Sequence, residues 1–484
     1  MRDNIYLPYL EWEFSNFPIT INKLKFEQSN WGFSDDTIIE IWRDEKFRLR
    51  GKICGNISDF KKNNEIHFVE KGNIVKGQTI TGVDFSGNNI ELQECFLTTF
   101  HTNSLQITGK SYFTEGGLTL DSLRIQFSQH PDKKEKLTRL DWFLCNKIDA
   151  HFIERTFRKA SQKKIRVGID EYDESIEDLI GSSSSKDYAV VKLPQIEFIV
   201  AKVPEIFLQD QYGLCLEFRN KINEVNENLI AGISHFISFL LGNEIKHIGY
   251  TLVNDDVLIE SNLETVNNKK SAYSMPPIKF NFQYEWGNFS WLLNQLLPKY
   301  LELRREISLD EALSRYWIAR RTPLGANLPI LASALEIIVE KYLKQKSDYK
   351  NEHLPQNEYL TLIGAELKEL KNKLSSLKGG EIILNKISGA FRKGVNEKMN
   401  HFLSSTGIEI GKSEKEAIAL RNKMAHASRD YSDENRAHDD LIYSRVYEVL
   451  FHRVILKLLE YDGCYIDYSL YKCPSKYIGQ SVGK

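Results

Sequence analysis

A short segment, EAIALRNKMAHAS at 416–428, holds the side chains in this sequence whose types and spacing best suit chemistry. Arg421 is followed directly by Asn422, and His426 lies five residues beyond the arginine. A histidine with an ordinary pKa of about 6.5 can accept and return a proton near neutral pH. An arginine can hold a phosphate in its planar fork and stabilise negative charge on the oxygens. The segment therefore predicts proton transfer beside a phosphate group.

The sequence lacks the motifs of several other enzyme classes. It contains no GxxxxGK[ST] loop, no GxGxxG after a predicted strand, no HExxH and no GxSxG. The sequence therefore gives little support to a function as an ATPase, a dinucleotide-dependent enzyme, a zinc protease or a serine hydrolase. The six cysteines are scattered without a CxxC pair, which argues against a disulfide framework or a structural zinc site. We expect neither a metal nor a cofactor.

Spacing alone does not single out Arg421 and His426. Two other pairs, Arg124 with His130 and Arg445 with His452, have a similar separation. The first pair lies in strand-like sequence, and the second lies inside an apolar helix where His452 is better explained by packing. The pair of Arg421 and His426 differs from both, because it follows a predicted helix start in an all-helical region.

A second helix is expected to hold the arginine. LPILASALEIIVEKYL at 328–343 has apolar residues at helical spacing, with Glu336 among them. A carboxylate in such a stripe is costly to bury unless a cation meets it, and Arg421 is the natural partner. The helix that carries Arg421 is expected to begin near Ser413, with Glu416 three residues later in the spacing of a capping box.

The region 278–484 is predicted to be an all-α bundle. Its apolar periodicity and its Gly and Pro punctuation place the helix boundaries. The predicted helices lie near 288–306, 309–320, 328–346, 357–377, 381–402, 413–428 and 434–461.

The region 1–277 is predicted to be β-rich. Its first part alternates polar and apolar residues between turn signals, which favours a sandwich-like unit. An acidic and Ser-rich break near 170–187 separates this unit from an α+β part, whose helix lies at 223–242 and stops at Gly242. The expected strands lie at 47–57, 90–100, 118–127, 188–193, 196–203 and 248–253. The fold class is therefore α+β and multidomain, divided at 277/278.

The charge balance limits the classes of partner. The whole chain has a net charge of −2, but residues 278–484 hold 31 basic and 26 acidic side chains, and residues 1–277 hold 33 and 40. A strongly basic nucleic-acid coat is excluded, whereas a local basic site in the C-terminal region is not. No apolar run approaches the ~20 residues that span a bilayer. The N-terminus lacks an apolar signal core, so we expect no membrane contact and a cytoplasmic location.

The helical region resembles the HEPN domain, specifically the ApeA-like branch found in bacterial anti-phage defence proteins. Three features carry the resemblance, which covers roughly 285–461. They are the LxxALE pattern around Glu336, the RNxxxH motif from Arg421 to His426, and the long helix that follows. The N-terminal region is similar to that of ApeA-like proteins only in its layout.

The resemblance implies a metal-independent RNA endonuclease of a phage-defence system that acts by abortive infection. RNA carries its own nucleophile, the 2′-hydroxyl, so cleavage would leave a 2′,3′-cyclic phosphate and a 5′-hydroxyl. A transfer RNA is a plausible substrate, because an unpaired loop frees the 2′-hydroxyl for in-line attack. The implied roles are catalytic for Arg421, Asn422 and His426, supporting for Glu336, and RNA-binding for Lys423 and Arg429.

The resemblance also implies a homodimer. Positions five apart on a helix differ by about 140° around its axis. Arg421 and His426 therefore share no face unless the helix end deforms. HEPN domains pair two motifs across a symmetric cleft, so both chains would line one groove. The N-terminal region would be a sensor that restrains the nuclease or recognises a phage-derived trigger.

The same residues also allow a non-catalytic interpretation. Arg421 could pair with Glu336 and simply join two helices, while His426 could face the C-terminal dipole of its own helix. The alternative function is then a HEPN-like dimerisation or binding protein whose N-terminal domain binds a ligand or partner.

Overall fold

The structure is a computed structural model of the 484-residue chain. The chain divides into two compact units, one of Met1–Met275 and Phe280–Pro298, the other of Pro276–Lys279 and Lys299–Lys484. The division passes through helix α3 (Phe289–Glu306). The structure describes residues 18–26, 37–44, 47–56, 77–103, 113–128, 137–145, 154–157, 184–203, 212–219, 222–254, 257–266, 272, 275–280, 288–323, 326–426 and 434–483.

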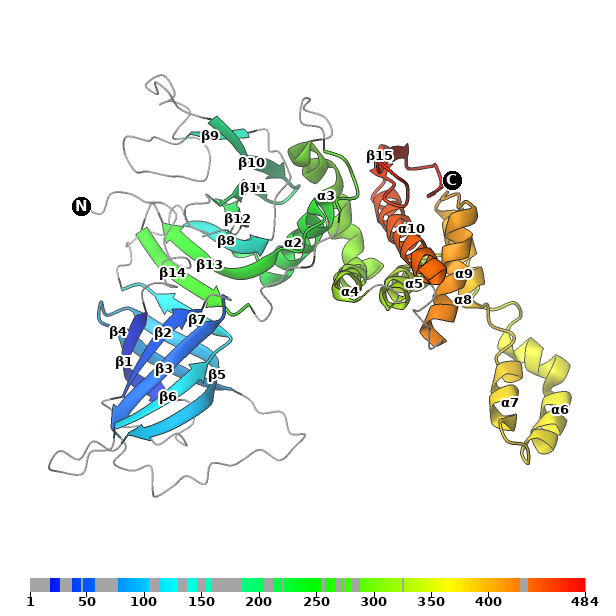
Figure 1. Ribbon diagram of the computed structural model, residues 1–484, viewed down its shortest axis with the longest axis horizontal. Helices are drawn as coiled ribbons and strands as arrows, with labels where there is room; N and C mark the ends of the chain where they lie inside the picture. The colour runs from blue at the N-terminus through cyan, green and yellow to red at the C-terminus, as the bar shows by residue number, and fades with distance from the viewer. Residues whose placement is uncertain are drawn as a thin grey trace. The chain divides into compact units, whose positions relative to one another are not determined.

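Six antiparallel strands of the first unit close into a barrel (Figure 1). Their order is β4-β1-β2-β3-β6-β5, and pairing between β4 and β5 completes the ring. Buried aliphatic side chains such as Ile39, Ile80 and Leu118 fill the interior. The predicted sandwich-like unit is therefore wrong in detail, because β5 pairs with β4 as well as β6. The strands are β1 (Ile19–Phe26), β2 (Ile38–Arg43), β3 (Leu49–Asn56), β4 (Gln78–Asp84), β5 (Asn89–Asn103) and β6 (Phe113–Thr119).

The sheet continues beyond the barrel because the first residues of β5, Asn89 to Gln93, also pair with β7. The added strands follow the order β7-β14-β13-β8-β12-β11-β10-β9, and each pair of neighbours is antiparallel. They are β7 (Ser122–Gln126), β8 (Leu137–Cys145), β9 (Glu154–Phe157), β10 (Ser184–Lys192), β11 (Glu197–Lys202), β12 (Tyr212–Phe218), β13 (Lys246–Asn254) and β14 (Val257–Glu264).

Helix α2 (Glu227–Leu241) interrupts this series of strands. The Asn226 side chain accepts a hydrogen bond from the Leu229 N–H at 2.9 Å, which satisfies a donor at the helix start. The helix ends at Gly242, whose φ of 60° suits glycine and closes the last turn. The predicted stop at Gly242 is confirmed.

The second unit is mostly helical, so the α+β prediction is confirmed at the level of a β-rich region followed by helices. The predicted helix 381–402 is wrong, because it is two helices with glycines at 389 and 394 between them. A two-stranded sheet of β15 (Cys464–Ile466) and β16 (Ser475–Tyr477) was also not expected. The helices after α3 are α4 (Leu309–Arg321), α5 (Asn327–Gln345), α6 (Gln356–Leu374), α7 (Gly380–Ser388), α8 (Val395–Ser405), α9 (Lys412–His426) and α10 (Glu434–Leu458).

Within the described part of the chain, no helix combines the length and the apolar character needed to cross a bilayer.

The hairpin of α6 and α7 differs from the rest of the helical unit (Figure 1). In these two fully described helices, the one buried residue is Gly380. Apolar side chains such as Leu362 and Ile382 are 65% and 63% exposed. The Tyr359 hydroxyl donates to the Ile387 carbonyl and joins the two helices. The hairpin therefore holds together mainly through contacts between its own two helices.

A buried ion pair joins the start of α9 to α10. Arg453 Nη1 lies 2.5 Å from Glu414 Oε1, and both side chains are fully buried. Arg453 also donates to the backbone carbonyls of Glu409 and Ile478. The second carboxylate oxygen of Glu414 accepts the Gly411 N–H at 2.7 Å. Every charge in this pair therefore has a partner, which a buried ion pair requires.

The predicted capping box at the start of α9, Ser413 with Glu416, is wrong. The acid that reaches back to the helix start is Glu414 on Gly411, rather than Glu416 on Ser413. Glu416 instead accepts a hydrogen bond from the Tyr443 hydroxyl of α10 at 2.9 Å. The helix begins one residue earlier than expected, because glycine can occupy the cap while the acid turns inward to meet an arginine.

We expect Arg453→Met to lower the free energy of unfolding of the helical unit by about 3–5 kcal/mol, because it leaves the Glu414 charge buried without its cation. The double variant E414L/R453M should recover most of that loss, since neither charge is then buried. Urea unfolding followed by circular dichroism measures both. The matched control is Glu340→Gln, which removes the exposed pair with Lys344 and should change little. A single variant as stable as this control would contradict the prediction.

Candidate functional site

The Arg421 side chain lies inside the helical unit. It is 2% exposed, on helix α9, which packs against α5 and α10. Its Nη1 lies 3.3 Å from Glu336 Oε1 on α5, and its Nη2 donates to Asn396 Oδ1 on α8 at 3.0 Å. One guanidinium therefore ties together three helices, and the sequence-predicted residues Glu336 and Arg421 meet.

A tyrosine completes the surroundings of this guanidinium. Tyr447 of α10 is fully buried, and burial raises the pKa of its hydroxyl to about 12, although the positive charge of Arg421 opposes this shift. Among the described residues, the buried Nε and Nη1 of Arg421 find no hydrogen-bond acceptor. The side chain of Glu336 is 38% exposed, so water reaches one end of the ion pair. The guanidinium is thus held by a hydrogen bond to Asn396 and by an ion pair with the partly solvated carboxylate of Glu336.

The helix continues without interruption from Arg421 to His426. These two positions therefore lie about 140° apart around the axis of α9. No deformation within α9 brings them onto one face. Asn422, Lys423 and His426 belong to α9, but their side chains lie outside the described part of the structure, and Arg429 lies outside the described residues altogether.

The arrangement assigns Arg421 a mechanical role in this conformation. A guanidinium with 2% exposure, engaged with Glu336 and Asn396, does not present its fork to a phosphate in solvent. It fixes the last turns of α9 relative to α5 and α8. Since α9 is also fixed at its start by Glu414, both ends of the helix are positioned by charge. Arg421 therefore connects α9 to α5 and α8 in the turns that precede His426.

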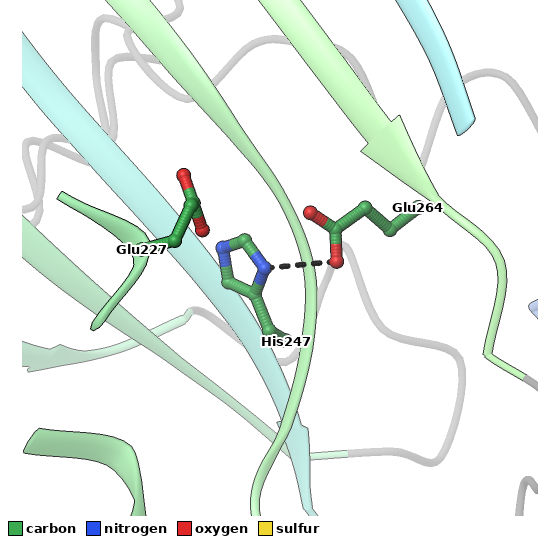
Figure 2. A group of neighbouring side chains, drawn as sticks. All are labelled: Glu227, His247 and Glu264. Carbon is green, nitrogen blue, oxygen red and sulfur yellow. Dashed lines mark hydrogen bonds and ion pairs between the residues drawn. The ribbon is translucent and has the colours of Figure 1, made fainter. Parts of the chain in front are cut away.

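A second cluster of ionisable side chains lies in the β-rich unit, and sequence analysis missed it. Figure 2 shows the His247 ring of β13 between Glu227 of α2 and Glu264 of β14. Its Nδ1 is 3.0 Å from Glu264 Oε2, and its Nε2 is 3.2 Å from Asp141 Oδ1 on β8. One ligand atom from each of Glu227, His247 and Glu264 lies within 4.8 Å of the others, so a metal site has to be considered.

The chemistry of these groups fits an ion-pair network better than a metal site. Both ring nitrogens of His247 already face carboxylates, which leaves neither directed at an unshared ligand position. Arg139 donates to Asp141 at 2.8 Å and to Glu227 at 3.0 Å, so a cation already occupies this space. Burial lowers the pKa of His247, but hydrogen bonds from its ring to Asp141 and Glu264 outweigh burial and raise the pKa to about 10. The ring is therefore a cation at neutral pH.

The sequence holds only a faint signal of this cluster. Arg139 and Asp141 are two residues apart on a strand that is apolar from Trp142 to Cys145, which indicates charge on one face of a buried strand. The register then places Asp141 opposite Tyr250, and a shift in pairing follows His247. That register depends on strand pairing between residues about a hundred positions apart, which no local pattern specifies.

The raised pKa of His247 predicts a stability that depends on pH. The folded-state pKa is about 10 and the unfolded value is about 6.5, so the stabilisation is complete below pH 6.5 and disappears as the pH rises through 10. We expect His247→Gln to be destabilised most at pH 6 and progressively less towards pH 10. Urea unfolding of both proteins at several pH values measures this difference.

A metal site would give a different result. The destabilisation of the variant would then grow as the ring loses its proton, and dialysis against EDTA would lower the melting temperature of the wild-type protein. Either finding would overturn the ion-pair assignment.

No protein-family model, curated protein or solved structure matches the chain.

Proposed function

We propose that this protein is a metal-independent RNA endonuclease of the HEPN type that acts in phage defence through His426. The observation that supports the proposal best is the contact between Arg421 and Glu336. The LxxALE pattern and the RNxxxH motif are far apart in the sequence, yet α5 and α9 bring their charged residues to 3.3 Å. This is the packing that a single HEPN site built from both motifs requires.

In this proposal, His426 is the proton-transfer group. It accepts the proton of an RNA 2′-hydroxyl, the 2′-oxygen attacks the adjacent phosphorus, and the bond to the 5′-oxygen breaks. The leaving 5′-oxygen takes a proton, so the products are a 2′,3′-cyclic phosphate and a 5′-hydroxyl. Arg421 positions the helix segment, and Asn422 orients the phosphate or the imidazole. Rigid support of this kind lowers the entropic barrier to attack.

Because Arg421 is buried, we infer that other side chains make the contacts with RNA. Lys423 and Arg429 supply the positive charge that holds RNA phosphates. A second copy of the chain contributes its own Asn422 and His426 to the same groove, which makes the active form a homodimer. The substrate is a structured RNA with an unpaired loop, such as a transfer RNA, and the N-terminal unit regulates access in response to a phage-derived trigger.

A non-catalytic function is the second candidate, and one specific observation favours it. Arg421 is 2% exposed and is held by Glu336 and Asn396, as expected of a residue that only joins helices. Under this function, the HEPN-like unit dimerises or binds a partner, the N-terminal unit binds a ligand, and no RNA is cut.

The first test is cleavage of total bacterial RNA by the purified protein in EDTA. We expect the wild-type protein to leave 2′,3′-cyclic phosphate ends, and His426→Ala to cut at least about a hundredfold more slowly, because general acid–base catalysis contributes about 10²–10⁴-fold. The matched control is His438→Ala, which changes an exposed histidine near the start of α10 and should cut normally. Undiminished cutting by His426→Ala would remove the site assignment.

A second test separates positioning from structural joining. Glu336→Gln leaves the buried Arg421 charge without a carboxylate partner, so we expect the free energy of unfolding to fall by about 1–3 kcal/mol. If Arg421 positions a nuclease site, cleavage by the folded variant at low temperature also falls, mainly in kcat. A variant that loses stability but cuts with wild-type kcat would contradict the positioning role. Wild-type protein that cuts no RNA, alone or in phage-infected lysate, would favour the second candidate.

A further inference from the structure

A hollow on the outer wall of the barrel lies in the β-rich unit, and its chemistry is independent of the nuclease proposal. It spans β1, β4, β5 and β7 and has a volume of about 380 Å³ (Figure 1 places these strands). We call it the lysine hollow. Its lining includes Lys23, Lys25, Thr81, Asn89, Arg124 and Gln126.

A β-bulge in β1 turns both lysines outward. In the segment ITINKLKF, Ile21 points into the barrel core, but after the bulge Leu24 and Phe26 do so instead. The pairing with β4 shifts between Asn22 and Lys25, and Lys23 takes a φ of 50°, which residues other than glycine rarely adopt. The reversal places Lys23 and Lys25 together on the outer face, where strict alternation would direct both into the core.

The bulge also explains why β4 has a glycine at this point. A Cβ on Gly82 would lie 2.5 Å from Ile21 Cγ2 and 2.8 Å from the Asn22 carbonyl oxygen. Strands β1 and β4 can therefore approach each other at this point only because residue 82 has no side chain. Gly82 itself lines the hollow. The backbone that shapes the hollow is thus fixed by packing on its core side.

Strand register places the polar side chains of the hollow in two rows. Lys25 lies opposite Thr81, Thr81 opposite Glu91, and Glu91 opposite Arg124. In the next row on the same face, Val83 lies opposite Asn89, which lies opposite Gln126. The short side chains of Thr81 and Val83 separate the lysines from the longer groups of β5 and β7. Donors therefore stand on both sides of an open space, which the Glu91 carboxylate also borders.

The charges of the hollow favour an anion. Lys23 and Lys25 are exposed, and neither ammonium group has a carboxylate partner within the described part of the chain. Arg124 pairs with Glu260 at 2.7 Å, but its buried Nε has no acceptor among the described residues. Glu91 is the one acidic side chain in the lining, against three basic ones. An anionic ligand would give the two ammonium groups the partner they lack.

We propose that the lysine hollow binds a small phosphate-bearing molecule. Two adjacent ammonium groups and the amides of Asn89 and Gln126 suit the several oxygens of a phosphate or diphosphate. The volume matches a compact ligand. The lining contains no aromatic side chain on which a nucleobase could stack, so the phosphate rather than a base is recognised.

Calorimetric titration of the full chain with inorganic pyrophosphate at low salt tests the proposal. Wild-type protein should bind, and K23G/K25A should bind at least about tenfold more weakly, because each charge-assisted hydrogen bond to phosphate is worth about a tenfold change in affinity. Glycine at position 23 tolerates the positive φ found there, so we expect the double variant, which lacks both ammonium groups, to keep the melting temperature of the wild-type protein. The matched control is Lys192→Ala, an exposed lysine of β10 outside the hollow, which should bind as the wild-type protein does.

Three results would overturn the proposal. The first is a wild-type protein that binds no pyrophosphate. The second is equal binding by K23G/K25A and the wild-type protein when both show the same melting temperature. The third is binding of a single-stranded RNA oligonucleotide that depends on Lys23 and Lys25 while pyrophosphate neither binds nor competes, which would assign the hollow to nucleic acid.

Discussion

The fully buried pair of Glu414 and Arg453 is the interaction on which the helical unit depends. Two opposite charges removed from water tolerate little displacement, since each must keep its partners. Arg453 meets that condition by also holding two backbone carbonyls, one of them in the C-terminal segment after α10. The start of α9 is thereby fixed. Arg421 and Glu336 connect its later turns to α5, and the buried Ala417 and Ile418 add apolar packing to these contacts.

The β-rich unit uses charge in a similar way. Arg139 donates to Asp141 and Glu227, and the His247 ring contacts Asp141, so these side chains connect β8 and β13 to the start of α2. The buried apolar face of the sheet already specifies its register, and the hydrogen bonds between the His247 ring and two carboxylates add to that constraint. Each unit thus combines an apolar core with a small set of buried charges.

Sequence patterns anticipated the parts of this structure that local physics determines. The apolar stripe around Glu336 predicted α5 and its need for a cation, and Gly242 predicted the end of α2. Barrel closure was missed, because it depends on pairing β4 with β5 and on a β5 long enough to serve several partners. The Asp141–His247 contact was missed for the same reason. By contrast, the switch of apolar positions in ITINKLKF is a local signal, and it indicates the bulge at Lys23 once the core is known.

The hairpin of α6 and α7 has a consequence for motion. A segment whose helices bury only Gly380 gains little from the rest of the protein, so its opening free energy is set by its own two helices. Its backbone amides should therefore exchange with solvent deuterium by local opening, long before the amides of α5 or α10 do. The helical unit therefore contains two parts that open separately. One is a bundle joined by buried charges, and the other is the hairpin of α6 and α7, which opens without disturbing the bundle.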